Sequence, residues 1–120
     1  PLIDMVDPRR IFGNAAEHDA AAFLKSQGMT ILEAQYRNRF GEIDIIAKDG
    51  DEFVMVEVKA RKDHEFGYPE ESVTKSKLRK IAIVAEHYMA SRPHIAWRID
   101  VIAIEYDHTP PKITHIIGVG

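Results

Sequence analysis

Hydrophobic residues recur with a helical period in two separate parts of the chain. The first stripe spans residues 9–27 and stops at Gly28, a residue type typical of helix ends. Its apolar positions are Ala16, Ala20, Phe23 and Leu24. The second stripe follows Thr74, a suitable N-cap, and runs to about residue 90. Its apolar positions are Leu78, Ile81, Val84, Ala85 and Tyr88. We therefore predict two main helices.

Runs rich in β-branched and aromatic residues predict strands at residues 29–37, 42–48, 52–61, 96–106 and 112–119. The resulting order along the chain is α-β-β-β-α-β-β. This order predicts an α/β fold with one mixed central sheet of about five strands, flanked by the two helices.

The segment from Gly41 to Arg61, GEIDIIAKDGDEFVMVEVKAR, predicts a hairpin that turns at Asp49-Gly50-Asp51. Strand alternation gives each arm one apolar face and one face where charges gather. In the first arm the apolar face is expected to hold Ile43, Ile45 and Ala47, and the other face Glu42, Asp44 and Ile46. In the second arm the charged face holds Met55, Glu57, Lys59 and Arg61.

A two-residue turn at Gly50-Asp51 would place Asp44 opposite Glu57 and Glu42 opposite Lys59. Glu42 and Lys59 are then an expected ion pair. Asp44 and Glu57 are two like charges brought together, and such a pair of carboxylates resists double ionisation. A divalent cation would remove this conflict, and Mg²⁺ favours one or two carboxylates together with waters and phosphate oxygens. The alternative is a solvated face on which Lys59 neutralises both acids, and the spacing does not separate the two readings.

The composition of the chain limits the number of domains and the classes of chemistry, but it does not indicate a function. The chain has 120 residues, 45% of them hydrophobic, which predicts one domain over residues 1–120. The absence of cysteine excludes disulfide and thiolate chemistry and is compatible with the cytoplasm, where we expect the protein. The first residues do not have the pattern of a signal peptide, and no apolar run is long enough for a membrane span. We therefore expect no membrane partner.

The net charge of −3 means that nucleic-acid binding would have to depend on a local patch. Basic residues gather around the hairpin and in the first turns of the second helix. They are Arg37, Arg39, Arg61, Lys62, Lys75, Lys77, Arg79 and Lys80. Cations oppose the dipole at a helix N-terminus, so a phosphate backbone explains Lys75 and Lys77 better than helix stability does. The alternative is a solvated charged face offset by Glu70 and Glu71.

The periodicity of the helices and strands also predicts the direction of further charged side chains. Lys77 is in line with Ile81, so its side chain is expected to lean toward the sheet. Arg98 and Asp100 share one face of a predicted strand, where we expect a structural ion pair.

The hairpin resembles the signature of the YraN-like family of predicted bacterial nucleases. The resemblance extends to GNAAEHDAAAFLKSQG and YRNRFGEID upstream and to FGYPEESVTKSKLRKI and WRIDVIAI downstream. It implies a restriction-endonuclease-like core, similar to that of archaeal Holliday-junction resolvases. Gln35 stands where the family pattern leads us to expect Asn.

The resemblance also implies site residues. Glu17, Asp44, Glu57 and Lys59 match the family's catalytic positions. Asp44 and Glu57 would hold Mg²⁺ or Mn²⁺, with further ligands from Glu17 and the carbonyl of Val58. Lys59 would orient the attacking water or stabilise developing charge.

The expected function is metal-dependent hydrolysis of phosphodiester bonds in DNA, with branched or flapped DNA as the favoured substrate. Two alternatives stay open: a nucleic-acid-binding module without catalysis, and a protein-interaction domain whose charged hairpin is solvated. Resolving a four-way junction takes two symmetric cuts, which implies a homodimer. Its interface could include Ile113, Ile116, Ile117 and Val119, although core packing explains these residues equally well.

Overall fold

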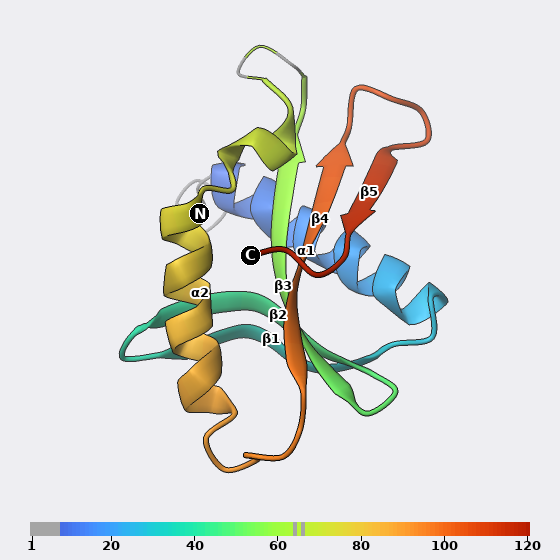
Figure 1. The fold of residues 1–120 in the computed structure, drawn as a ribbon. Coiled ribbons are helices and arrows are strands. Elements are labelled where there is room, and N and C mark those ends of the chain that lie inside the picture. Colours follow the sequence, from blue (N-terminus) through green and yellow to red (C-terminus); the bar gives the residue numbers. More distant parts are fainter. Residues whose placement is uncertain (1–7, 64, 66) are drawn as a thin grey trace, which may run out of the picture.

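The computed structural model describes residues 8–63, 65 and 67–120, and these form one five-stranded sheet with two main helices (Figure 1). The elements in chain order are α1 (Pro8–Ser26), β1 (Thr30–Asn38), β2 (Gly41–Asp49), β3 (Glu52–Arg61), the short 3₁₀ helix η2 (Pro69–Ser72), α2 (Lys75–Tyr88), β4 (Trp97–Glu105) and β5 (Lys112–Ile116). The strands are arranged in the order β1-β2-β3-β4-β5, and only β3 and β4 run parallel. The predicted α/β fold and its element order are confirmed.

The two helices cover opposite faces of the sheet (Figure 1). On one face Ala16, Ala20 and Leu24 of α1 pack against buried side chains of β2, β3 and β4. On the other face Ile81, Val84 and Ala85 of α2 pack against a second buried cluster. Residues Val54 and Val56 belong to the first cluster, whereas their neighbours Phe53 and Met55 belong to the second. Because side chains of β3 alternate between two apolar layers, the strand is firmly fixed in the centre of the molecule.

The hairpin turns at Gly50-Asp51, as predicted, with Asp49 opposite Glu52. The backbone φ of Gly50 is +61°, a value that glycine adopts without steric cost. One part of the predicted pattern is wrong, because Ile43 packs in the α2 cluster while Ile45 packs in the α1 cluster. Two residues that should share a face thus point to opposite sides. The strand changes orientation between them, at Asp44.

The start of β2 lies close against α2. A Cβ atom added to Gly41, whose φ is +147°, would lie 3.2 Å from Cγ2 of Val84. Glycine therefore allows the β1–β2 turn to approach the helix. This approach brings β2 and α2 together where the charged residues of the hairpin begin.

The predicted ion pair of Arg98 and Asp100 is confirmed and forms part of a buried network. Asp100 is fully buried, and its Oδ1 accepts hydrogen bonds from Arg98 Nε at 3.0 Å and from the backbone N–H of Gly118 at 3.0 Å. Its Oδ2 lies 2.7 Å from Nε2 of His115. Burial by itself would raise the pKa of Asp100, but Arg98, Gly118 and His115 together hold the pKa below its usual value.

The last strand contributes mainly to the core. Ile113 packs against the α1 cluster and Val119 against the α2 cluster, while Ile117 is 61% exposed. Core packing therefore accounts for two of the four apolar residues that could have formed a dimer interface. In the described part of the chain, no helix has the length and apolar character that crossing a membrane requires.

Candidate functional site

The ladder between β2 and β3 ends just before the predicted catalytic residues. Its last pair is Ile45 with Val56, so Asp44 and Glu57 do not face each other as ladder partners. Instead, Oδ2 of Asp44 accepts a hydrogen bond from the backbone N–H of Val58 at 2.8 Å. The carboxylate thus takes the place of a missing strand partner. The change of orientation at Asp44 points its side chain across the end of the hairpin and toward β3.

The predicted ion pair between Glu42 and Lys59 is wrong. Glu42 pairs with Arg37 at 2.7 Å, and Lys59 Nζ lies 3.3 Å from Oε1 of Glu57. The physical reason is that the paired part of the two strands runs only from the turn to Ile45 and Val56. Residues before Ile45 and after Val56 are not ladder partners, so the register that would have brought Glu42 opposite Lys59 is lost.

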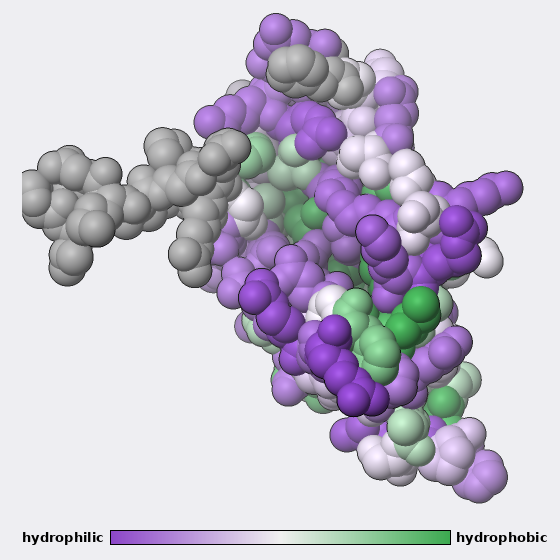
Figure 2. Space-filling model, turned by 90° about the vertical axis from the view of Figure 1, so that its left-hand side faces the viewer, coloured by the Kyte–Doolittle hydropathy of each residue, from purple (hydrophilic) through white to green (hydrophobic). Residues whose placement is uncertain are grey.

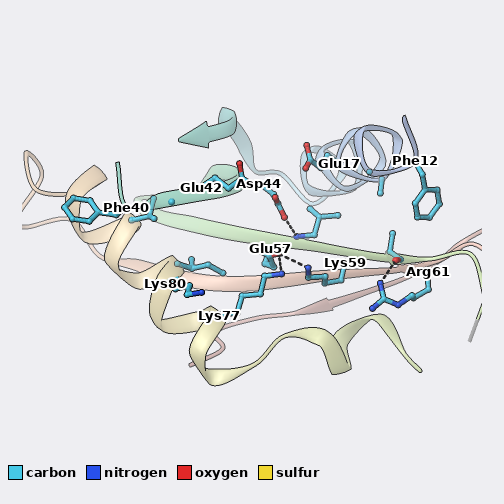
Figure 3. Close-up of a pocket in the computed structure, with 17 residues that line it drawn as sticks. Phe12, Glu17, Phe40, Glu42, Asp44, Glu57, Lys59, Arg61, Lys77 and Lys80 are labelled. Atoms are coloured by element: carbon cyan, nitrogen blue, oxygen red, sulfur yellow. Dashed lines mark hydrogen bonds and ion pairs between the residues drawn. The ribbon is translucent and has the colours of Figure 1, made fainter. Parts of the chain in front are cut away.

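The four residues assigned to catalysis line one cleft of about 440 Å³ (Figure 3). Glu17 comes from α1, Asp44 from β2, and Glu57 and Lys59 from β3. The other lining residues are Phe12, Gly13, Ala16, Phe40, Gly41, Glu42, Val58, Ala60, Arg61, Lys77, Lys80, Ile81 and Val84. Figure 2, which views the side of the molecule where α2 lies, shows a hollow with apolar residues at its bottom and polar residues around it.

Burial and neighbouring acids make the charge of Asp44 unfavourable. Burial is the main cause that raises its pKa to about 7, followed by the negative charge of Glu57, with Glu17 adding to the effect. The hydrogen bond from Val58 and the positive charge of Lys59 act in the opposite direction. A carboxyl group with this pKa is half protonated at neutral pH, so the site favours a cation that replaces the proton.

Glu57 is held by two lysines. Its side chain is 8% exposed, and Oε1 lies 3.3 Å from Nζ of both Lys59 and Lys77 (Figure 3). Burial lowers the pKa of Lys59, and its hydrogen bond with Lys77 lowers it further. Lys77 was assigned to nucleic-acid binding from the sequence. The predicted lean of its side chain toward the sheet is confirmed and brings its amine to the carboxylate of Glu57.

Glu17 is oriented by a residue that sequence reasoning did not assign to the site. Nε2 of Gln35 donates to Oε2 of Glu17 at 2.9 Å and to Oδ1 of Asn14 at 2.9 Å. The backbone φ of Gln35 is +52°, a left-handed conformation that is uncommon for residues other than glycine, Asn and Asp. The only signal in the sequence was that Gln replaces the Asn expected from the resemblance.

The donor atoms in the cleft suit a hard divalent cation. Carboxylate oxygens of Asp44 and Glu57 and the backbone carbonyl of Val58 are ligand types that Mg²⁺ and Mn²⁺ accept. Among the described residues, the one group of three possible ligands with all ligand atoms within 4.8 Å of one another is Glu105, Asp107 and His108, at the end of β4. Glu17, Asp44 and Glu57 therefore do not form a closed cage. An open arrangement fits Mg²⁺, which keeps several of its waters.

The basic residues predicted to bind nucleic acid do not form one patch. Arg61, Lys77 and Lys80 line the cleft. Lys75 and Arg79 line a separate hollow beside Trp97. The guanidinium of Arg39 lies 4.8 Å from the centre of the Phe40 ring, and Nζ of Lys62 lies 5.0 Å from the centre of the Phe12 ring. Arg37 pairs with Glu42, as described above, and lines a neighbouring polar hollow together with Glu17 and Asp44.

Arg61 has an unusual feature within the cleft. Its Nη1 donates to the carbonyl of Ala60 at 3.0 Å, while its buried Nε has no hydrogen-bond partner among the described residues. Buried donors of this kind are nearly always paired in folded proteins. The unpaired N–H is suited to an anionic acceptor that enters the cleft.

Comparison with known proteins gives one consistent result. A model of the uncharacterised protein family UPF0102, to which the name YraN refers, matches residues 16–104. A UPF0102 protein of Geotalea daltonii is 44% identical over 110 residues, which cover 89% of this chain and 87% of the relative. A UPF0102 protein of Caldicellulosiruptor saccharolyticus is 41% identical over 98 residues, which cover 80% of this chain and 83% of the relative. The chain belongs to the UPF0102 family.

Proposed function

We propose that this protein is a cytoplasmic nuclease that uses Mg²⁺ or Mn²⁺ to hydrolyse phosphodiester bonds in DNA. The observation that carries the proposal is the carboxyl of Asp44. It is half-buried beside the buried carboxylate of Glu57, its pKa is raised to about 7, and it shares a cleft with Lys59. A fold has little reason to place a half-buried acid beside a buried one for stability alone, because their repulsion is a cost.

Each residue has a role that follows from its position. Asp44 and Glu57 would hold the metal, together with the carbonyl of Val58. Glu17, held by Gln35, would bind the metal or its waters from the α1 side of the cleft. When bound, the metal supplies a Lewis acid for the phosphate and lowers the pKa of a water ligand. Lys59 would orient the attacking water and offset the negative charge that develops on the phosphate oxygens.

The substrate would be held through its phosphates. Arg61 lines the cleft and has an N–H without a partner among the residues that the structure describes, and Lys80 adds a positive charge to the wall of the cleft. These contacts are to the backbone and carry no sequence information. Lys75 and Arg79 lie outside the cleft, and they could contact DNA only where it continues past α2.

Branched or flapped DNA is the proposed substrate class. Reading a sequence requires several side chains placed in a groove, and the two main helices and five strands all contribute to the two packed layers of the core. A backbone-binding cleft can instead select DNA by shape. On a four-way junction, two symmetric cuts would require two copies of the chain.

The proposal is tested by measuring cleavage of linear, flapped and four-way DNA and of RNA, with Mg²⁺ or Mn²⁺ at fixed salt. We expect metal-dependent cleavage of branched DNA that is faster than cleavage of the matched linear duplex. Tight DNA binding without cleavage would favour a non-catalytic binding module instead. Equal rates on junction and linear DNA, or sedimentation of a monomer on the junction, would refute the branched-substrate part alone.

A further inference from the structure

Two lysines from different elements share a single carboxylate oxygen in the cleft. Nζ of Lys59 and Nζ of Lys77 each lie 3.3 Å from the same atom, Oε1 of Glu57. Lys59 belongs to β3 and Lys77 to the first turn of α2. Two positive charges therefore lie beside the single negative charge of Glu57, whose side chain is almost completely buried.

This oxygen is also one that the proposed metal would need. Oε1 of Glu57 is already in contact with two positive charges, and a divalent cation placed there would be repelled by both. For the metal to use Oε1, at least one lysine must leave. Two lysine ammonium groups thus contact the oxygen atom of Glu57 that a cation would use.

Lys77 is the lysine better placed to leave. Its side chain is 38% exposed, compared with 20% for Lys59, and it lines the same cleft as Lys80. Its backbone N–H is held by Oγ1 of Thr74, the N-cap of α2, at 3.2 Å. The backbone is therefore fixed, while the long side chain can change partner by rotation about its own bonds.

We propose that Lys77 is a built-in counter-ion of Glu57 that a divalent metal displaces and that then binds a phosphate of the DNA. This inference rests on the proposed function, because it assumes that the cleft binds both metal and DNA. Its consequence is a coupling between the two ligands. Metal binding frees Lys77 for the phosphate, and phosphate binding frees Glu57 for the metal. By thermodynamic linkage the two effects are equal in size.

The first test measures Mn²⁺ binding by calorimetry in the absence of DNA. Lys77→Gln removes the competing charge, so we expect it to bind Mn²⁺ roughly tenfold more tightly than the wild type, which corresponds to about 1.4 kcal/mol. Lys80→Gln is the matched control, because it removes a lysine from the same helix and the same cleft. We expect that control to remain within about twofold of the wild type.

Lys77→Arg keeps the positive charge and should bind Mn²⁺ with an affinity close to that of the wild type. Circular dichroism of each variant verifies that it is folded. An Mn²⁺ affinity of Lys77→Gln that equals or falls below that of the wild type would overturn the inference. A wild-type protein and a Lys77→Gln variant that both fail to bind Mn²⁺ would overturn the proposed function itself, and the inference with it.

The second test measures the coupling directly. The affinity for a four-way DNA junction is determined with and without Ca²⁺, a cation that also takes carboxylate oxygens. In the wild type we expect Ca²⁺ to strengthen DNA binding, and in Lys77→Gln we expect this enhancement to fall several-fold. An enhancement of the same size in both proteins would show that Lys77 does not exchange partners.

Discussion

Replacing Asp44 with Asn should stabilise the metal-free protein at alkaline pH. The wild-type carboxyl is half-buried beside Glu57, and deprotonating it inside the fold costs free energy. Asn has nearly the same shape, cannot ionise, and can still accept the hydrogen bond from the N–H of Val58. The variant would therefore keep the local structure and lose the electrostatic cost.

The size of the effect follows from the pKa of Asp44. The pKa rises from 3.8 to about 7 on folding, because burial and Glu57 disfavour the charged form. The folded state keeps its proton across this range while the unfolded state has lost it, so wild-type stability falls as the pH rises from about 4 to about 7. At about 1.4 kcal/mol per pH unit the full loss is about 4 kcal/mol, and we expect about 2–4 kcal/mol to be measurable at pH 8.

The assay is urea unfolding with a chelator present, at pH 5 and at pH 8. The wild type has already lost about a third of this stability by pH 5, so Asp44→Asn should be more stable than the wild type by about 1–1.5 kcal/mol at pH 5 and by the larger amount given above at pH 8. Asp51→Asn is the matched control, since Asp51 is exposed in the hairpin turn, and its effect should be small at both pH values. A difference between Asp44→Asn and wild type that is independent of pH, or a loss of stability at pH 8, would refute this reasoning.

Three further predictions concern other parts of the site and the core. Lys59→Met should slow single-turnover cleavage by about 100-fold or more without weakening Mn²⁺ binding, because a charged lysine is no metal ligand. Gln35→Gly keeps the left-handed backbone available but releases Glu17, so we expect several-fold slower cleavage with a melting temperature within about 3 °C of the wild type. Asp100→Asn breaks the buried contact with Arg98, and urea unfolding should show a loss of about 3 kcal/mol with unchanged Mn²⁺ affinity.

The fold could be predicted because its elements are encoded locally. Apolar residues at helical spacing identified both helices, and Thr74 is indeed the N-cap of α2, with its Oγ1 accepting from Lys77. The register of the hairpin was also correct from the turn to Ile45 and Val56, because a two-residue turn fixes which residues face each other. These features depend on neighbours in the sequence.

The prediction failed where the sheet stops being regular. Strict alternation placed Ile43 beside Ile45, but the strand changes orientation at Asp44 and Ile43 packs under α2. The expected pair of Glu42 and Lys59 was lost at the same point. Such a change is determined by contacts with two helices that lie on opposite faces, and no short stretch of sequence contains that information.

The candidate site, like the fold, could be predicted from the sequence only in part. Side chains expected to act together do line one cleft. Strand alternation sets the common direction of Glu57 and Lys59, whereas the direction of Asp44 depends on the change of orientation in β2. The contacts of Lys77 with Glu57 and of Gln35 with Glu17 join residues that are 20 and 18 positions apart in the chain. The second of these contacts also depends on a left-handed backbone at Gln35, which the residue type does not signal.

The central claim is that a divalent metal binds between Asp44 and Glu57, and the most direct test is to locate it. Crystals soaked in Mn²⁺ would be measured for anomalous scattering from the metal. We predict a peak within about 2.3 Å of an oxygen of Asp44 and of an oxygen of Glu57, with Nζ of Lys77 moved away from Oε1. An empty cleft under saturating Mn²⁺, or a peak at Glu105, Asp107 and His108 alone, would contradict the claim.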